Sequence, residues 1–141
     1  MTKREAVGNI MTKNLVKLNL KDSLSKAEAL FKKNKIKHLP VVSGDKIVGM
    51  LSYSDLLRIS FADATDESGD YVESTVYDMF SLEQVMTSKV VCVNTEDSIK
   101  QVAEILAAKH FHALPVIEND KIVGIVTSTD IINYFLQQFK S

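Results

Sequence analysis

The side chains with the clearest chemical potential form two short runs, Ser52-Tyr53-Ser54-Asp55 and Thr127-Ser128-Thr129-Asp130. Each run combines hydroxyls with a carboxylate and follows an apolar segment that begins with glycine. A Ser or Thr followed three residues later by an acid predicts a helix N-cap. The same geometry suits ligand binding, because a helix start attracts phosphate and a carboxylate there accepts hydrogen bonds from vicinal ribose hydroxyls. Capping and ligand binding are compatible.

The histidines and the cysteine offer weaker chemistry. Among His38, His110 and His112, the last two lie two residues apart, and no cysteine or carboxylate completes a familiar metal-ligand spacing. The sequence also lacks the glycine motifs of serine hydrolases, P-loops and dinucleotide folds. Cys92 lies in an apolar run that we expect to be a buried strand, a poor setting for a nucleophile. We therefore expect no metal, no required cofactor and no enzymatic activity.

These groups belong to a duplicated chain. A shift of 75 residues aligns positions 7–57 with positions 82–132 without a gap, and 15 of the 51 pairs are identical. A duplication of this kind predicts two copies of one structural unit. The longest identical stretches are Met11-Thr12 with Met86-Thr87, Leu39-Pro40-Val41 with Leu114-Pro115-Val116, and Asp45–Gly49 with Asp120–Gly124.

Each copy predicts the order strand, helix, strand, strand, helix. We expect the first strand at residues 15–18 or 90–93, and Asp22-Ser23 or Asp97-Ser98 to cap the first helix. Two apolar runs around polar turn residues then predict a hairpin, and a second helix begins near Asp55 or Asp130. The first helices carry apolar residues at helical spacing, namely Leu24, Ala27, Leu30 and Phe31 in one copy and Ile99, Val102, Ala103 and Leu106 in the other.

The fold class is therefore α/β (α+β), with two β-α-β-β-α repeats packed sheet to sheet, since one unit alone leaves a face of its sheet uncovered. We place repeat 1 at residues 1–60, an acidic linker at 61–81 and repeat 2 at 82–141. We expect residues 63–70 to form a polar surface loop. The apolar residues beyond it, Val72, Tyr77, Met79 and Phe80, are expected to dock on the core or on a partner. The surplus of apolar residues in the helix over 131–139 suggests a homodimer.

Composition narrows the cellular context. No apolar run is long enough to span a bilayer, and the N-terminal residues lead into no secretory core. A single cysteine fits a reducing cytoplasm. Residues 1–58 hold most of the lysines, which raises nucleic-acid binding as an alternative. The lysines there are not interleaved with the aromatic and arginine residues that nucleic-acid surfaces usually show, so a solvated helix face is the preferred interpretation.

The combination of a Met-Thr start, Leu-Pro-Val after a helix and Gly-x-x-Ser/Thr-x-x-Asp at the end of each copy resembles tandem CBS (cystathionine β-synthase) domains, paired as a Bateman module. The resemblance covers about residues 7–57 and 82–134. It implies a pseudo-two-fold pair of units, often dimerised, with clefts between the repeats that bind adenosine-containing ligands such as AMP, ADP, ATP or S-adenosylmethionine. It also implies a regulatory role exerted through attached or partner proteins.

In the family, the hydroxyl-carboxylate run of one repeat completes a pocket with the first strand and the Leu-Pro region of the other. The resemblance therefore implies two pockets in this chain. Pocket A would be lined by Lys17, His38, Leu39, Pro40, His112, Ile125, Thr127, Thr129 and Asp130. Pocket B would be lined by Ser52, Ser54, Asp55, Cys92, Ala113, Leu114 and Pro115, with Lys37 or His38 nearby.

Departures from the family pattern make the two pockets unequal. The family often has a small hydroxyl residue where this chain has Lys17 and Cys92, and an arginine where it has His38 and Ala113. Lys17 adds a point charge near a phosphate, unless it points to water from an edge strand. We expect pocket A to be the main site and pocket B to be weaker or empty. The alternative to a sensor with an unknown protein target is a ligand-free dimerisation or interaction scaffold.

Overall fold

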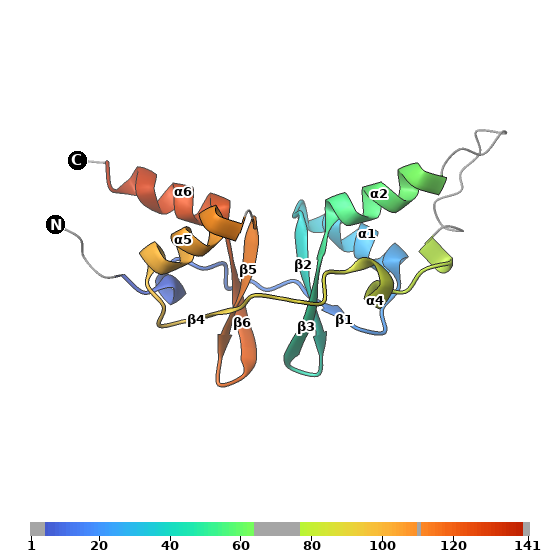
Figure 1. Ribbon diagram of the computed structural model, residues 1–141, viewed down its shortest axis with the longest axis horizontal. Coiled ribbons are helices and arrows are strands. Elements are labelled where there is room, and N and C mark those ends of the chain that lie inside the picture. The colour runs from blue at the N-terminus through green and yellow to red at the C-terminus, as the bar shows by residue number, and fades with distance from the viewer. Residues whose placement is uncertain (1–4, 64–76, 110, 140–141) are drawn as a thin grey trace. The chain divides into compact units, whose positions relative to one another are not determined.

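The computed structural model describes residues 5–63, 77–109 and 111–139, which form two compact units (Figure 1). One unit consists of the described residues from Val16 to Lys89. The other joins the described residues up to Leu15 to those from Val90 onward. Each unit contains one three-stranded sheet whose helices cover one face, so each builds a small core between sheet and helices.

The first unit contains β1 (Leu18–Asn19), α1 (Leu24–Asn34), β2 (His38–Ser43), β3 (Lys46–Ser52), α2 (Tyr53–Asp63) and α4 (Leu82–Val85). Strand β1 runs parallel to β2, and β2 runs antiparallel to β3. The hairpin is closed by Gly44 and Asp45, and Gly44 has a φ of 66°, a conformation that glycine adopts without steric cost.

The second unit contains η1 (Val7–Asn9), β4 (Val93–Asn94), α5 (Ile99–Lys109), β5 (Ala113–Glu118), β6 (Lys121–Thr127) and α6 (Ser128–Gln137). Its sheet repeats the order and directions of the first. Its hairpin turn is Asn119-Asp120, both with positive φ, which matches a tight type I′ connection. The predicted order strand, helix, strand, strand, helix is thus confirmed in both copies.

Local chemistry places the first helix of each repeat as the sequence predicted. The Ser23 hydroxyl accepts a hydrogen bond from the Lys26 amide at 3.1 Å, and the Ser98 hydroxyl accepts one from the Gln101 amide at 3.1 Å. Both serines therefore satisfy amide groups that a helix start leaves unpaired. The predicted apolar positions face the sheet, and those that are buried are Leu24, Ala27 and Phe31 in α1, and Ile99, Val102 and Leu106 in α5.

The segment before each repeat belongs to the unit of the other repeat. Val7 is fully buried in the core formed by β4–β6, α5 and α6, and its amide donates to the Asp97 carbonyl at 2.7 Å. Leu82 and Met86 are correspondingly buried in the core of the first unit. The compact units therefore do not share the boundaries 1–60 and 82–141 of the sequence repeats. Figure 1 shows the N-terminal segment beside α5 and the α4 segment beside the first unit.

Three expectations need correction. The first strand of each repeat is shorter than predicted: β1 and β4 have two residues each, so Lys17 and Cys92 precede the strands. The apolar run around Cys92 is not buried as a whole, because Val91 is exposed and Cys92 is half-buried. Helix α2 continues into the expected linker as far as Asp63.

The C-terminal part of the linker meets its prediction in part. Tyr77 is buried and Phe80 packs against the first core, whereas Met79 is 68% exposed and does not dock on its own unit. Val72 and residues 64–70 of the predicted loop lie outside the described residues. Among the described helices, none is long and apolar enough to cross a membrane.

Candidate functional site

The hydroxyl-carboxylate run of the second repeat forms a reciprocal cap at the start of α6. The Thr127 hydroxyl accepts a hydrogen bond from the Asp130 amide at 3.1 Å, and Asp130 Oδ2 accepts one from the Thr127 amide at 3.0 Å. This pair is a capping box with Asp in the place of Glu. The Asp130 side chain is half-buried and the neighbouring Thr129 is exposed. The cap predicted from the spacing is thus confirmed, and it fixes a carboxylate at the edge of the sheet.

A second contact to Asp130 comes from the start of the chain. Thr12 and Ile125 form an antiparallel bridge, with amide-to-carbonyl distances of 2.8 and 3.1 Å. This bridge brings the Thr12 hydroxyl within 3.2 Å of Asp130 Oδ2 and 3.4 Å of Oδ1. A neutral hydroxyl at these distances is a long, weak donor. The Met-Thr pair is a repeated feature of the sequence, but its spacing does not indicate a contact with Asp130.

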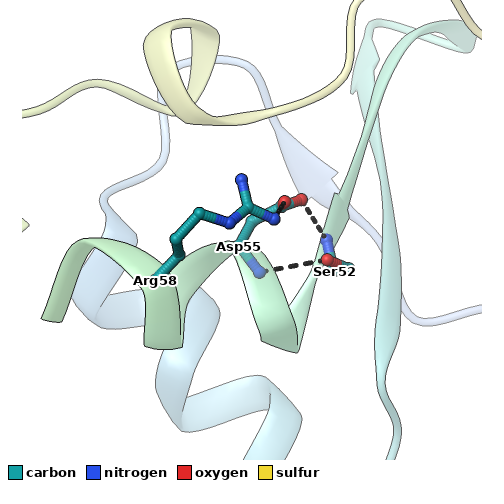
Figure 2. A network of polar contacts seen from close by, with 3 residues as sticks. All are labelled: Ser52, Asp55 and Arg58. Atoms are coloured by element: carbon teal, nitrogen blue, oxygen red, sulfur yellow. Dashed lines mark hydrogen bonds and ion pairs between the residues drawn. The ribbon is translucent and has the colours of Figure 1, made fainter. Parts of the chain in front are cut away.

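The first repeat builds the same cap with a different neighbour (Figure 2). The Ser52 hydroxyl accepts from the Asp55 amide at 3.1 Å, and Asp55 Oδ2 accepts from the Ser52 amide at 3.0 Å. Asp55 Oδ1 accepts from a guanidinium nitrogen of Arg58 at 2.9 Å, so the carboxylate is part of an ion pair. Sequence reasoning missed Arg58 as a partner, although its position three residues after Asp55 in a helix was a usable signal.

Hairpin register places the residue before Leu-Pro opposite the cap of its own unit. His38 is the cross-strand partner of Ser52, and Ala113 is the partner of Thr127. The main chain reinforces this arrangement, because the Ser128 amide donates to the His112 carbonyl at 3.0 Å. His112 itself is exposed and Ala113 is buried. Each unit therefore gathers its own Leu-Pro region and its own hydroxyl-carboxylate run at one end of its hairpin.

The remaining predicted residues divide by exposure. Lys17 and Ser54 are exposed, whereas His38 and Cys92 are half-buried. Burial raises the pKa of the Cys92 thiol, which reduces the thiolate fraction at neutral pH and agrees with the expectation that it is a poor nucleophile. The predicted site residues that are buried are Leu39, Pro40, Ala113, Leu114, Pro115 and Ile125.

The buried members of that set contribute mainly to packing. Leu39 and Leu114 are core residues of the first and second unit, respectively. Lys17, His38, Leu39 and Pro40 belong to the first unit, whereas Thr127, Thr129 and Asp130 belong to the second. Their combination into pocket A, like the composition of pocket B, stays a prediction. Across the described residues, no group of three His, Cys, Asp or Glu side chains is placed to hold a metal ion. His110 lies outside the described residues.

The CBS-domain model matches this sequence twice, over residues 7–62 and 82–137. The chain belongs to the CBS-domain family. The two matches together cover most of the chain, and their boundaries agree with the duplication found from the 75-residue shift.

Among curated relatives, the protein MJ1225 of Methanocaldococcus jannaschii is 28% identical over 135 residues, covering 93% of this chain and 47% of the relative. A homoserine O-acetyltransferase of Methanohalobium evestigatum is 32% identical over 127 residues, covering 89% of this chain and 23% of the enzyme. The chain thus spans less than half the length of these two relatives.

Solved structures share the fold. The CBS domain pair of protein MJ0100, in complex with 5′-methylthioadenosine and S-adenosyl-L-methionine, has a TM-score of 0.80 and 24% identity, covering 96% of this chain and 99% of that one. CBSX2 in complex with AMP has a TM-score of 0.78 and 24% identity, covering 96% and 98%. These similarities confirm the mixed α and β fold of the chain.

Proposed function

We propose that this chain is a regulatory sensor module that binds an adenosine-containing ligand and transmits its presence to a partner protein. The candidate ligands are AMP, ADP, ATP and S-adenosylmethionine. The module itself carries out no reaction in this proposal. A ligand that binds one conformation of the module better than another shifts the population toward that conformation. The partner's activity changes in response to this shift.

The observation that carries the proposal is the Thr127–Asp130 cap. The carboxylate is held by the Thr127 amide, so it is fixed in position before a ligand arrives. A fixed, half-buried carboxylate is a good acceptor for two ribose hydroxyls, and the exposed Thr129 hydroxyl beside it is a donor for phosphate. The Thr12 hydroxyl also contacts the Asp130 carboxylate, and a ribose hydroxyl can replace it as a neutral donor.

The named complexes of the structural neighbours support the ligand class. MJ0100 is bound to 5′-methylthioadenosine and S-adenosyl-L-methionine, and CBSX2 is bound to AMP. These three ligands share adenosine and differ at the 5′ position. A site centred on a ribose-binding carboxylate accounts for that tolerance, because the common part of the ligand is what the carboxylate contacts.

Titration calorimetry with AMP, ADP, ATP and S-adenosylmethionine tests the proposal. Asp130→Asn keeps the size of the side chain and an acceptor for the Thr127 amide, but removes the charge. Hydrogen bonds to a charged group contribute about 1.5–3 kcal/mol, so we expect this variant to bind at least about tenfold more weakly. The matched variant Asp55→Asn should change the affinity little. Unchanged binding by Asp130→Asn would place the ligand elsewhere.

A ligand-free dimerisation scaffold is the second candidate, and the exposed face of α6 favours it. Ile132, Phe135 and Leu136 are 56%, 47% and 58% exposed, and Phe139 beyond the helix is 84% exposed. Apolar groups of this size on one helix suit burial against a second copy of the chain. A dimeric mass in solution that Leu136→Glu converts to a monomer, without a thermal shift from any nucleotide, would favour the scaffold over the sensor.

A further inference from the structure

We propose that Arg58 blocks the ribose-binding carboxylate of the first repeat, so that the chain binds one adenosine-containing ligand, at Asp130, and not a second one at Asp55. This inference rests on the proposed function and deepens it. It names the residue that makes two nearly identical sites unequal, and therefore sets the number of ligands that the module senses.

Both oxygens of Asp55 already have donors. The Ser52 amide donates to Oδ2 at 3.0 Å, and a guanidinium nitrogen of Arg58 donates to Oδ1 at 2.9 Å (Figure 2). The Asp55 side chain is only 14% exposed, whereas that of Arg58 is 72% exposed. Arg58 therefore lies on the solvent side of the carboxylate, where an incoming ribose would have to make its contacts.

The second repeat lacks this group. The position that corresponds to Arg58 in the 75-residue shift is Asn133, an exposed residue of α6. The cap of Asp130 is otherwise the same, with the Thr127 amide at 3.0 Å from Oδ2. The two carboxylates thus differ in their second partner. Asp55 pairs with a guanidinium, whereas Asp130 has a long contact with the Thr12 hydroxyl.

The chemistry of exchange favours binding at Asp130. A ribose diol that reaches Asp130 replaces one neutral hydroxyl by another, so little is lost. A diol that reaches Asp55 must displace the Arg58 guanidinium, which leaves the negative charge of a partly buried carboxylate without its cation. Charge-assisted hydrogen bonds are about twice as strong as neutral ones, so this exchange is unfavourable. Because Arg58 is mostly exposed, water and salt weaken its ion pair. We therefore expect a block of about tenfold in affinity, not an absolute one.

The closing experiment exchanges the residues of the two repeats at this position. In an Asp130→Asn background, where the second-repeat site is disabled, Arg58→Asn should increase the affinity for 5′-methylthioadenosine about tenfold. In the otherwise unchanged chain, Arg58→Asn should raise the number of bound ligands from one to two. The reciprocal Asn133→Arg should weaken binding at Asp130 about tenfold, and Asn133→Ala is its control for loss of the amide. Thermal unfolding verifies that each variant is folded.

A second ligand, AMP, separates blocking from phosphate binding. If Arg58→Asn weakens the binding of AMP but not that of 5′-methylthioadenosine, Arg58 binds the phosphate and the inference is wrong. If the wild-type chain binds one ligand at Asp130 and Arg58→Asn changes neither affinity nor stoichiometry, the inference is also wrong while the proposed function stands. If neither the wild-type chain nor any variant binds an adenosine-containing ligand, the proposed function fails, and this assignment fails with it.

Discussion

At the scale of single residues, one hydroxyl has two potential roles. Thr127 caps α6 through its contact with the Asp130 amide, and it lies next to the carboxylate that we assign to the ligand. The same spacing predicts a cap in many proteins, so the spacing alone does not distinguish a ligand site from a helix cap. What distinguishes this one is the repeated context and the position of Asp130 at the end of a hairpin. The two roles are separable, because a cap stabilises the empty protein whereas a ligand contact stabilises only the complex.

We expect Thr127→Ala to lower the free energy of unfolding of the unliganded protein by about 1 kcal/mol, the usual effect of losing a capping hydroxyl. Thr127→Ser keeps the hydroxyl and should restore most of that stability. Urea unfolding without and with AMP measures both roles, since added ligand stabilises the folded state according to its affinity. If Thr127→Ala leaves stability unchanged without ligand, the cap contributes nothing and the contact serves binding alone.

The sequence predicted part of this site for a clear reason. Thr127 and Asp130 are three residues apart, so the helical geometry brings them together without help from the rest of the fold. Thr12 and Asp130 are 118 residues apart, and their contact depends on a strand-like bridge that no local pattern encodes. Arg58 was within local reach of Asp55, but only the observed side-chain conformation shows that it points to the carboxylate.

At the scale of elements, the Met-Thr segments explain why each hairpin carries a glycine. A Cβ atom on Gly124 would lie 2.6 Å from the Met11 sulfur and 2.9 Å from the Thr12 carbonyl oxygen. The three atoms nearest to a Cβ atom on Gly49 would all belong to the side chain of Met86, which is flexible. The sequence predicted both hairpins from their apolar runs and turn residues. It overestimated the first strands, because an apolar run of four residues does not reveal that only two of them pair with a neighbour.

These contacts predict that the two equivalent glycines differ in their tolerance of alanine. Gly124→Ala presses on main-chain atoms that are fixed by the paired hydrogen bonds between Thr12 and Ile125, so we expect it to cost about 1–3 kcal/mol. Gly49→Ala should cost less, since the Met86 side chain has other rotamers available. Thermal unfolding of the two variants in parallel measures the difference. Equal losses of stability would mean that the main chain at Thr12 moves to accept a Cβ atom as readily as the Met86 side chain does.

At the scale of the whole molecule, the two repeats exchange the segments that precede them. Val7 completes the core of the second repeat, and Leu82 completes the core of the first, although the shift of 75 residues makes them equivalent. The duplication predicted two similar units, but it could not predict this exchange, because the same apolar pattern is consistent with each segment folding back on its own repeat. The exchange links the second repeat to residues at the opposite end of the sequence.

Because of this exchange, a substitution in the segment before one repeat should destabilise the unit that contains the sheet of the other repeat. Val7→Ala removes buried methyl groups and should cost about 2 kcal/mol, with the loss of protection concentrated in β4–β6. Leu82→Ala should cost about 3 kcal/mol and expose β1–β3 instead. Hydrogen exchange followed by mass spectrometry resolves the two units as separate peptides, because local openings differ in free energy across a structure. Faster exchange in β2 and β3 of Val7→Ala, with β5 and β6 unchanged, would show that each segment packs on its own repeat.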